Sequence, residues 1–413
     1  MSTITIIGAG QSGLQLGLGL LQNGYEVTLI SDRTPEEIYN GRIASSQCMF
    51  DTPLKYERQV GIDFWDDAPW VEGIGFTIPD PENPNEKAVS WAHRLERPAQ
   101  AIDQRVKYPY LMEKFEERGG TIIFEAADIA ALERYAAASD LVIVAAGKGE
   151  IAGIFERDAE RSIFDKPQRA LSLTYVHGME PRPEFSAVCF NLIPGVGEYF
   201  VFPALTTTGP CEIMVMEGLP GGPMDCWKGL SPQEHFEQAK NVLHTFLPWE
   251  AERCHNVELT DDQGVLSGRF PPTVRKPVAQ LPSGTKVLGM ADVVLLNDPI
   301  TGQGSNNASR CAQSYLESIL AHEGPFDETF MQECFETYYD YAKYVARWTN
   351  SLLQPPTPHM QNVLATAQEY PEVASRMTEV FNNPKDSDWF LDEKVGQPYL
   401  DEVAAKQHAQ VSL

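Results

Sequence analysis

The hydrophobic residues at the start of the chain form a short unbroken run, Thr3 to Ile7, which is typical of a buried parallel strand. A glycine-rich turn, Gly8-Ala9-Gly10-Gln11-Ser12-Gly13, follows at once, and residues 14–22 predict a helix. A second apolar run, Glu26 to Ile30, predicts the next strand. The order of strand, turn, helix and strand indicates a βαβ unit at the head of the chain.

The middle of the chain changes to alternating apolar and polar positions. The runs Val188 to Ile193, Glu198 to Leu205 and Glu212 to Glu217 predict strands of an antiparallel sheet. Its bulky apolar side chains are candidates for a binding pocket, although plain core packing is the commoner role. These candidates are Phe190, Phe200, Phe202 and Met214.

The last quarter of the chain is helical in pattern. Phe326 to Leu353 predicts a long aromatic-rich helix, which is broken by the proline-rich segment 354–358, and Gln361 to Asn382 predicts further helix. The residues after Asp401 are polar and are expected to be disordered. The aromatic stripe of the long helix can form the face of a homodimer, but packing on the core is favoured.

Charge and composition exclude several classes of protein. In the 413 residues, 58 acidic against 32 basic residues give a formal charge of −26, which disfavours nucleic acid and anionic membranes as partners. No window approaches the roughly 18 consecutive apolar residues of a membrane span, and the start lacks a basic signal-peptide region. The seven cysteines contain no CxxC pair and the histidines no HExxH spacing, so we expect no metal site and a cytoplasmic location.

The glycine-rich turn has the spacing of a dinucleotide-binding motif. Gly8 permits the tight turn, Gly10 lets the backbone approach a pyrophosphate, and Gly13 lets the helix pack on the strand. The helix start at Gln11 and Ser12 supplies backbone N–H donors to the phosphates. An acidic residue should close the second strand and bind a ribose hydroxyl. Asp32 is the candidate, and Ser31 or a backbone group is the alternative.

A second signal far downstream indicates which dinucleotide is bound. The strand-like run from Lys286 ends at Gly289 and Asp292, and a further turn at residues 297–307 opens another helix. An aspartate at a strand end can accept hydrogen bonds from a ribityl chain, and a helix start can direct N–H groups at a flavin. The candidate cofactor contacts here are Asp292, Gly302, Gln303, Gly304, Ser305 and Asn306.

These two motifs together resemble the FAD-dependent aromatic hydroxylases built on the glutathione-reductase type of Rossmann fold. The resemblance implies an α/β fold with FAD bound, an inserted antiparallel-sheet substrate domain and C-terminal helices. It also implies that Arg105 lies beside the FAD, the alternative being an ordinary solvated arginine at a helix start. The expected division is FAD-binding parts at 1–60, 101–170 and 281–325, substrate parts at 61–100 and 171–280, and a helical region at 326–413.

One departure from that family changes the expected mechanism. Single-component members carry an aspartate after the strand that corresponds to residues 140–145, whereas this chain has Ala146. The pyridine-nucleotide contact is therefore in doubt, and the flavin would have to arrive already reduced. Over nearly its whole length the chain is most similar to the two-component styrene and indole monooxygenases, in which an NADH:flavin reductase supplies FADH2. The stretches that carry this similarity are 32–37, 166–171, 298–306 and 346–350.

A few residues favour indole as the substrate over styrene. Styrene-type members carry Asn, Val and His where this chain has Ser45, Gln47 and Met49, and they carry Ser in place of Ala99. The resemblance implies epoxidation of the indole C2=C3 bond by O2 through a flavin C4a-hydroperoxide, leading to indoxyl and indigo. Styrene monooxygenase and a single-component NAD(P)H-dependent hydroxylase are the alternatives. A non-catalytic flavin sensor or a halogenase relative is a third, but no GxWxWxIP motif is present.

The resemblance also suggests roles for the loop that follows the first βαβ unit. Ser45 and Ser46 are the catalytic candidates, because their hydroxyls can hydrogen-bond the reactive edge of the flavin. Arg42 is a candidate contact for the pyrophosphate or the ring. Gln47 and Met49 are expected to line the substrate pocket, although a methionine more often serves packing. Pro299 is expected to form an apolar wall, which completes the substrate-binding set.

Overall fold

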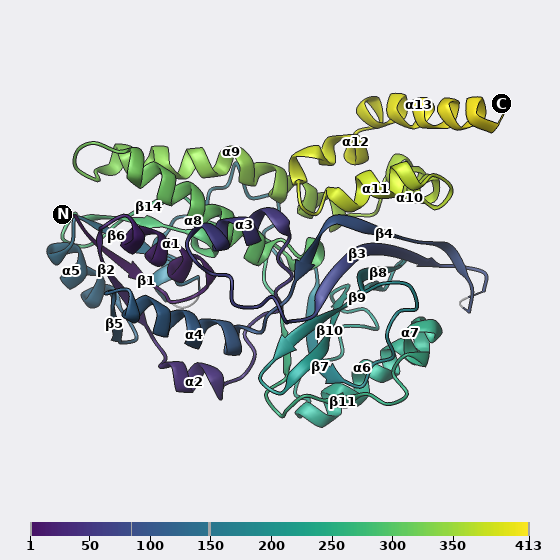
Figure 1. Cartoon of the computed structure of the whole chain (residues 1–413), viewed down its shortest axis with the longest axis horizontal. Helices are drawn as coiled ribbons and strands as arrows, with labels where there is room; N and C mark the ends of the chain where they lie inside the picture. The colour runs from purple at the N-terminus through teal and green to yellow at the C-terminus, as the bar shows by residue number, and fades with distance from the viewer. Residues whose placement is uncertain (1, 84, 148–149, 412–413) are drawn as a thin grey trace.

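Two β-sheets of different construction form the framework of the protein (Figure 1). The structure is a computed structural model that describes residues 2–83, 85–147 and 150–411. The first sheet is parallel except at one edge, where β14 runs antiparallel to β15. Its strand order is β14 (Val278–Gln280), β15 (Lys286–Gly289), β6 (Leu141–Val144), β1 (Thr3–Ile7), β2 (Glu26–Ser31) and β5 (Thr121–Phe124).

The parallel sheet is assembled from three separate parts of the chain, as expected for a Rossmann-type domain with insertions. Its central strand β1 and the helix α1 (Gln11–Gln22) are nearly all buried. The helix α8 (Gly304–Ala321) packs beside α1, where Gln15 Nε2 donates to the Ser309 carbonyl at 3.1 Å. The helices α4 (Gln104–Glu117) and α5 (Ile129–Ala138) complete this half of the molecule (Figure 1).

The second sheet contains the three predicted antiparallel strands as neighbours. Its order is β11 (Glu258–Leu259), β7 (Ala170–His177), β10 (Gly209–Gly218), β9 (Gly197–Thr206), β8 (Ala187–Ile193), β3 (Trp70–Pro79) and β4 (Lys87–Gln100), with β12 (Val265–Gly268) also on β7. Phe190, Phe200 and Phe202 lie in one buried cluster, whereas Met214 packs with α6 (Pro232–Phe246) in another. The four therefore do not line a single pocket, because residues of opposite parity on a strand point to opposite faces.

The C-terminal region is helical throughout its described part. The long helix α9 (Glu328–Leu352) buries Phe330, Phe335, Tyr338 and Trp348, so its aromatic stripe serves core packing, as favoured above. The expected helix at 361–382 is two helices, because Pro371 lacks the N–H that a continuous helix needs there. The expected disorder after Asp401 is wrong as far as Val411, because these residues extend the last helix, and residues 412–413 lie outside the described part. The bounds are α10 (Pro358–Glu369), α11 (Pro371–Glu379), α12 (Asp388–Leu391) and α13 (Glu393–Val411).

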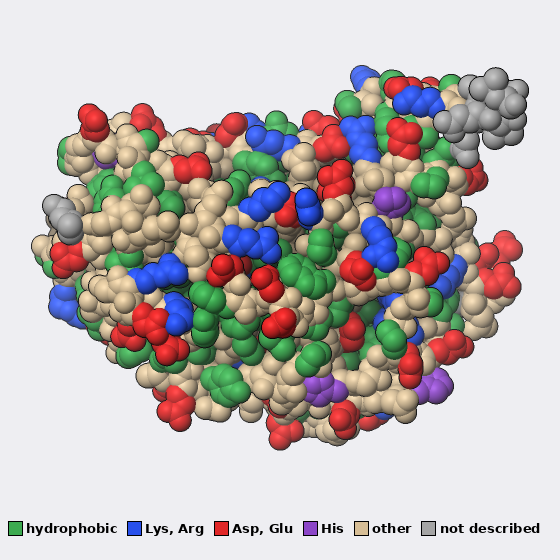
Figure 2. Space-filling model, viewed as in Figure 1, with side chains coloured by type: hydrophobic (Ala, Val, Ile, Leu, Met, Phe, Trp, Pro, Cys, Tyr) green, Lys and Arg blue, Asp and Glu red, His purple; other side chains and the backbone are tan. Residues whose placement is uncertain are grey.

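Short elements connect these units. They are α2 (Pro35–Tyr39), α3 (Asp51–Gln59), α7 (Pro248–Glu252), β13 (Thr273–Val274), β16 (Leu295–Leu296), and the 3₁₀ turns η1 (Glu150–Ile154), η2 (Ala291–Val293), η3 (Pro299–Thr301) and η4 (Pro384–Ser387). Figure 2 shows acidic side chains scattered over the visible face and interspersed with basic ones. Across the described ranges, none of the helices combines the length and the hydrophobicity needed to cross a bilayer.

Candidate functional site

The glycine-rich turn between β1 and α1 has the geometry that its sequence predicts. Gly8 adopts φ +119°, and a Cβ there would come within 2.9 Å of the Ala145 backbone. A Cβ on Gly13 would lie 2.0 Å from the Gly8 carbonyl oxygen, so only glycine lets the helix pack this closely on the turn. A Cβ on Gly10 would meet no described atom within 4 Å. The backbone at Gly10 therefore borders open space at a helix N-terminus, which fits a pyrophosphate.

The candidate for the ribose contact lies at the same edge of the sheet. β1 and β2 are parallel, with Ile7 opposite Ile30, so the ends of both strands meet beside Gly8. Asp32 is exposed there and forms an ion pair with Arg33 at 3.7 Å, while Ser31 is buried and its Oγ donates to the Arg33 carbonyl at 2.6 Å. Of the two, only Asp32 presents its side chain to solvent.

The third part of the predicted cofactor site is the turn that opens α8. The 3₁₀ turn η3 begins at Pro299, and Gly302 ends it with φ +62°. A Cβ at Gly302 or Gly304 would contact no described atom within 4 Å, so this helix start is also open. Gln303 is fully buried and donates to the Phe381 carbonyl at 2.9 Å, which ties the turn to the C-terminal helices. Ser305 is half-buried in the first turn of the helix.

Asp292 lies where the sequence places it, after the end of β15. The Met290 N–H donates to the Val144 carbonyl at 2.9 Å, which brings this segment beside the end of β6. A Cβ at Gly147 would come within 2.8 Å of the Asp292 Cβ. Asp292 therefore faces the position next to Ala146, and its exposed side chain borders the same edge as the glycine-rich turn.

The loop of residues 42–49 connects the two sheets. Arg42 Nε donates to the Val265 carbonyl at 2.7 Å, so part of its guanidinium is committed to β12 of the second sheet. The Ser45 carbonyl accepts from the Tyr175 hydroxyl at 3.0 Å, and Ser45 Oγ donates to the Ser46 carbonyl at 2.8 Å. Ser46 is half-buried beside it. These contacts hold the loop at the junction of the sheets.

Gln47 and Met49, the substrate-binding candidates of this loop, are buried and contact side chains of α4. Gln47 Nε2 donates to the Tyr108 hydroxyl at 2.7 Å, and Lys107 Nζ lies 3.3 Å from Met49 Sδ. Burial raises the pKa of Tyr108, so the side chain stays a neutral phenol. The Tyr108 oxygen also interacts with the backbone of Gln11, at the start of α1. Gln47 is thereby linked to the glycine-rich turn through one side chain.

A buried ion pair supports this arrangement. Lys107 and Glu57 contact each other with side chains that are each 2% exposed, and Gln11 Nε2 donates to Glu57 Oε1 at 2.6 Å. A buried pair of this kind is costly unless its remaining hydrogen bonds are satisfied. The Nε2 group of Gln11 therefore supports the turn, and the contact expected between Gln11 and a cofactor stays a prediction.

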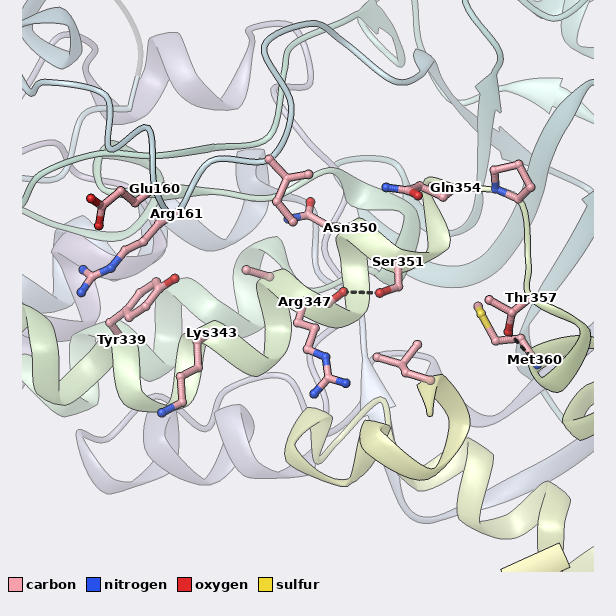
Figure 3. Close-up of a pocket in the computed structure, with 14 residues that line it drawn as sticks. Glu160, Arg161, Tyr339, Lys343, Arg347, Asn350, Ser351, Gln354, Thr357 and Met360 are labelled. Atoms are coloured by element: carbon pink, nitrogen blue, oxygen red, sulfur yellow. Dashed lines mark hydrogen bonds between the residues drawn. The ribbon is translucent and has the colours of Figure 1, made fainter. Parts of the chain in front are cut away.

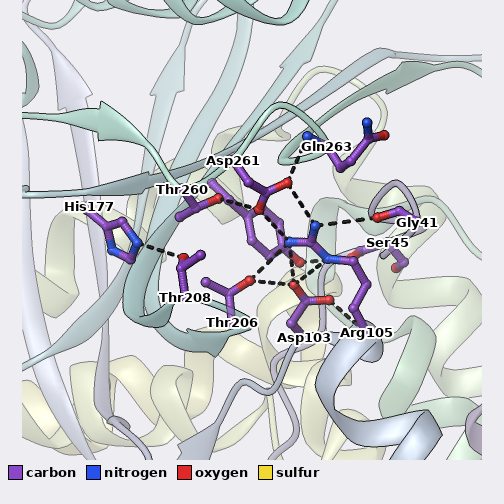
Figure 4. A network of polar contacts seen from close by, with 11 residues as sticks. Gly41, Ser45, Asp103, Arg105, His177, Thr206, Thr208, Thr260, Asp261 and Gln263 are labelled. Carbon is purple, nitrogen blue, oxygen red and sulfur yellow. Dashed lines mark hydrogen bonds and ion pairs between the residues drawn. The ribbon is translucent and has the colours of Figure 1, made fainter. Parts of the chain in front are cut away.

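Arg105 is the centre of a polar network that joins the two sheets (Figure 4). Its guanidinium binds Asp103 at 2.8 Å, binds Asp261 through two nitrogens at 2.9 and 3.0 Å, and donates to Thr206 Oγ1 at 3.1 Å. Its side chain is 4% exposed. Arg105 is therefore not the solvated arginine of the alternative interpretation. A direct contact with the cofactor stays a prediction, because the observed partners already occupy three of its nitrogens.

Comparison with known proteins identifies the family. The family model described as "Styrene monooxygenase A putative substrate binding domain" matches residues 147–253. The chain is 30% identical over 392 residues to "Styrene monooxygenase StyA" of Pseudomonas fluorescens, a match that covers 92% of this chain and 93% of that protein. A protein of the same name from Pseudomonas sp is 30% identical over 393 residues, with the same coverage of both chains. This chain belongs to the styrene monooxygenase family. It is a flavin-dependent monooxygenase.

Solved structures support the fold of this styrene monooxygenase family member. The flavin-dependent brominase Bmp2 matches with a TM-score of 0.59 at 13% identity, over 99% of both chains. The flavin-dependent halogenase CmlS matches with a TM-score of 0.63 at 15% identity, over all of this chain and 78% of that one. At these identities the likeness shows the fold alone, and it confirms the predicted Rossmann-type FAD domain with an added sheet domain.

Figure 3 shows a cavity of about 410 Å³ that lies apart from the predicted site of this monooxygenase. Tyr339, Lys343, Arg347 and Asn350 line one wall on successive turns of α9. Glu160, Arg161 and Ile163 contribute from another segment. Lys343 and Arg347 are already paired with Asp340 and Asp388. None of the residues predicted to bind cofactor or substrate lines this cavity. Most of the residues predicted for the functional site lie instead at the starts of α1 and α8 and in the loop of residues 42–49.

The sequence interpretation missed several residues that shape the site. Tyr108 and Lys107 were not singled out, although helical spacing places them one turn after the Asp103 cap of α4. Asp261 and Thr206, which hold Arg105, lie 156 and 101 residues away from it, so no local pattern connects them. Asn306 was predicted as a cofactor contact, and the structure gives it a further role in holding the loop at residues 48–50.

Proposed function

We propose that this protein is the oxygenase component of a two-component system that epoxidises the C2=C3 bond of indole with O2, using FADH2 from a separate NADH:flavin reductase. The product would lead to indoxyl and indigo. Support comes from family membership and from the indole-type residues Ser45, Gln47, Met49 and Ala99. Ala146, in place of the aspartate of single-component relatives, supports an external source of reduced flavin.

One observation carries the proposal: the loop with the substrate candidates is hydrogen-bonded directly to the start of α8, and it is linked to the start of α1 through Tyr108 of α4. On one side Gln47 binds Tyr108, which interacts with the backbone of Gln11 at the start of α1. On the other side Asn306 of α8 binds the Cys48 carbonyl at 2.7 Å and the Phe50 N–H at 2.8 Å. The residues proposed for substrate and for cofactor are therefore linked to one another, which supports the proposal.

The residues present fit an FAD molecule, because both helix starts are open where the backbone must approach the ligand. Gly8, Gly10, Ser12 and Gly13 would hold the pyrophosphate, with Asp32 at the adenosine ribose. The remaining contacts would come from Arg42, Arg105, Asp292, Gly302, Gln303, Gly304, Ser305 and Asn306. When bound, reduced FAD supplies the activation of O2.

The chain's own residues would orient the alkene and exclude water. Gln47 and Met49 are 3% and 1% exposed, and Pro299 borders the open turn at α8. The hydroxyls of Ser45 and Ser46 are the groups that we propose hold a proton beside the reacting atoms, and burial, which raises the pKa of the nearby Cys48 thiol to about 12, keeps that thiol neutral. Such chemistry needs a dry, oriented site more than a strong acid or base.

Styrene is the second candidate substrate, because both related proteins are named styrene monooxygenase. The test measures kcat/KM for indole and for styrene with an NADH:flavin reductase in excess, and NADH oxidation by the protein without reductase. We expect a larger kcat/KM for indole and no NADH oxidation by the protein alone. A larger value for styrene would reverse the substrate assignment, and NADH oxidation without reductase would contradict the two-component proposal.

A further inference from the structure

Two acidic side chains meet in the interior, between the second β-sheet and the turn that opens α8. Glu217 lies near the end of β10, and Asp298 immediately precedes Pro299. Glu217 is 0% exposed and Asp298 1% exposed. The two carboxyl groups lie near enough for one to donate to the other once one of them carries a proton. This contact joins the second β-sheet to the turn that opens α8, and none of the roles proposed above accounts for it.

The other hydrogen bonds around the pair leave three oxygens without a donor. Asp298 Oδ1 accepts from the Ile300 N–H at 3.1 Å and so caps the turn that contains Pro299. Asp298 Oδ2 and both carboxyl oxygens of Glu217 receive no hydrogen bond from any other described residue. Buried polar atoms are seldom left in this state, because each unmet hydrogen bond is costly. One proton shared between the two carboxyl groups satisfies an oxygen on each side.

The charges nearby do not neutralise the pair. The groups that face it are Arg169 and Glu198, and these bind each other through two hydrogen bonds at 2.7 and 2.9 Å. One arginine thus stands against three carboxyl groups, two of them fully buried. Burial, followed by the charge of Asp298, raises the pKa of Glu217 well above its usual range. Two carboxylates in contact inside a protein cannot both ionise at ordinary cost.

We propose that Glu217 and Asp298 hold one proton between them, as a carboxylic acid hydrogen-bonded to a carboxylate. This pair positions the turn that contains Pro299 against the second β-sheet. The link that matters for the reaction is Asp298, whose Oδ1 fixes the turn and whose buried Oδ2 has no donor among the other described residues. Its consequence for catalysis rests on the proposed function. The existence of the shared proton does not.

The first experiment detects the proton directly in the protein without cofactor or substrate. Infrared spectroscopy of the carbonyl stretch of protonated carboxylic acids compares the wild type, Glu217→Gln and the matched control Glu212→Gln. Glu212 lies on the same strand with opposite parity, and burial raises its pKa to about 7. The spectra are taken at about pH 8, where Glu212 is mostly ionised.

We expect a protonated-carboxyl band in the wild type and in Glu212→Gln, and its loss in Glu217→Gln, where Asp298 remains as a carboxylate that accepts from the Gln amide. A wild-type spectrum without the band would overturn the proposal. A band of undiminished intensity in Glu217→Gln would overturn it equally.

The second experiment tests the positioning role. Glu217→Leu removes the partner of Asp298 and leaves Oδ2 without a hydrogen bond, whereas Glu217→Gln keeps one. With indole and O2, we expect Glu217→Leu to raise the KM for reduced FAD by about tenfold and to divert turnover to hydrogen peroxide. Glu217→Gln should stay within about twofold of the wild type. Equal behaviour of the two variants would exclude positioning through this hydrogen bond.

These outcomes separate the inference from the proposed function. A protein that showed the band but formed no product from indole would keep the proton-sharing pair and lose the substrate assignment. A protein that epoxidised indole without the band would keep the function and lose the pair. If Glu217→Leu fails to fold, the infrared comparison with Glu217→Gln still decides the inference.

Discussion

Asn306 Oδ1 accepts a hydrogen bond from the Phe50 N–H at 2.8 Å, so the first turn of α8 holds the end of the loop that carries Gln47 and Met49. The other atom of the same amide, Nδ2, donates to the Cys48 carbonyl at 2.7 Å. One buried side chain thereby binds a backbone N–H and a backbone carbonyl of the same loop, as a neighbouring strand would. The relation explains how a helix start proposed to hold flavin also positions the residues proposed to meet the substrate.

Asn306→Ala should therefore destabilise the protein and loosen the loop. The change leaves the Phe50 N–H and the Cys48 carbonyl buried without partners, which should lower the free energy of unfolding by about 2–4 kcal/mol. Urea denaturation measures this, and titration with FAD should show weaker binding. Glu317→Ala, on an exposed position of the same helix, is the control and should stay within about 0.5 kcal/mol. Equal stability of the two variants would contradict the role given to Asn306.

The glycines of the first turn allow cofactor binding to be separated from folding. Gly10→Ala places a methyl group in open space, so the apoprotein should melt at the wild-type temperature, while FAD binding weakens by about tenfold or more because the methyl occupies the pyrophosphate position. Gly13→Ala is the contrasting variant: its Cβ would lie 2.0 Å from the Gly8 oxygen, and the apoprotein should be destabilised. Unchanged FAD affinity in Gly10→Ala would place the pyrophosphate elsewhere.

Stability should depend on pH through Glu212. Burial raises its pKa from 4.5 to about 7, so the folded protein holds a proton that the unfolded chain releases. The resulting stabilisation is complete below pH 4.5 and is lost as the pH rises to about 7. Across that window the wild type should lose about 3 kcal/mol relative to Glu212→Gln, and the difference should be constant at higher pH. Denaturation curves that run parallel for both proteins would refute this assignment.

Substrate preference should follow the loop at residues 45–49. The triple variant Ser45→Asn, Gln47→Val and Met49→His installs the residues of styrene-type relatives, and removal of the Gln47 amide also frees the Tyr108 hydroxyl. The ratio of kcat/KM for indole over styrene should fall by at least about tenfold, the usual effect of reshaping an apolar pocket. Met49→Leu conserves volume and should leave the ratio nearly unchanged. A ratio unaltered in the triple variant would remove these residues from the pocket.

The local motifs were predictable because their chemistry is local. Gly8, Gly10 and Gly13 act within one turn, and Pro299 to Gly304 act within another, so spacing alone indicates both helix starts. The strands around residues 188–217 were predictable from their alternation, since one face of the sheet is apolar. Alternation also held a signal that was not used: Glu217 shares the parity of the buried Ile213 and Val215, where a charged residue is unexpected.

What the sequence could not show are the partners brought together by folding. Arg105 has an ordinary helix-start context, and its role depends on Asp261, a residue of the other half of the molecule. The cavity beside α9 has walls from segments that are distant in the sequence, so no local pattern indicates it. Long-range pairs of this kind depend on how the two sheets dock, and that docking is set by packing over many residues.

The most direct test of the central claim supplies the purified protein with chemically reduced FAD, O2 and indole, without NAD(P)H and without a reductase. An external monooxygenase should form indoxyl, which oxidises to a blue pigment, because all the reducing power arrives with the flavin. Pigment in this mixture, and none when oxidised FAD replaces reduced FAD, is the result that we expect. Formation of hydrogen peroxide alone, with styrene as well as with indole, would contradict the proposed epoxidation and leave only the flavin site.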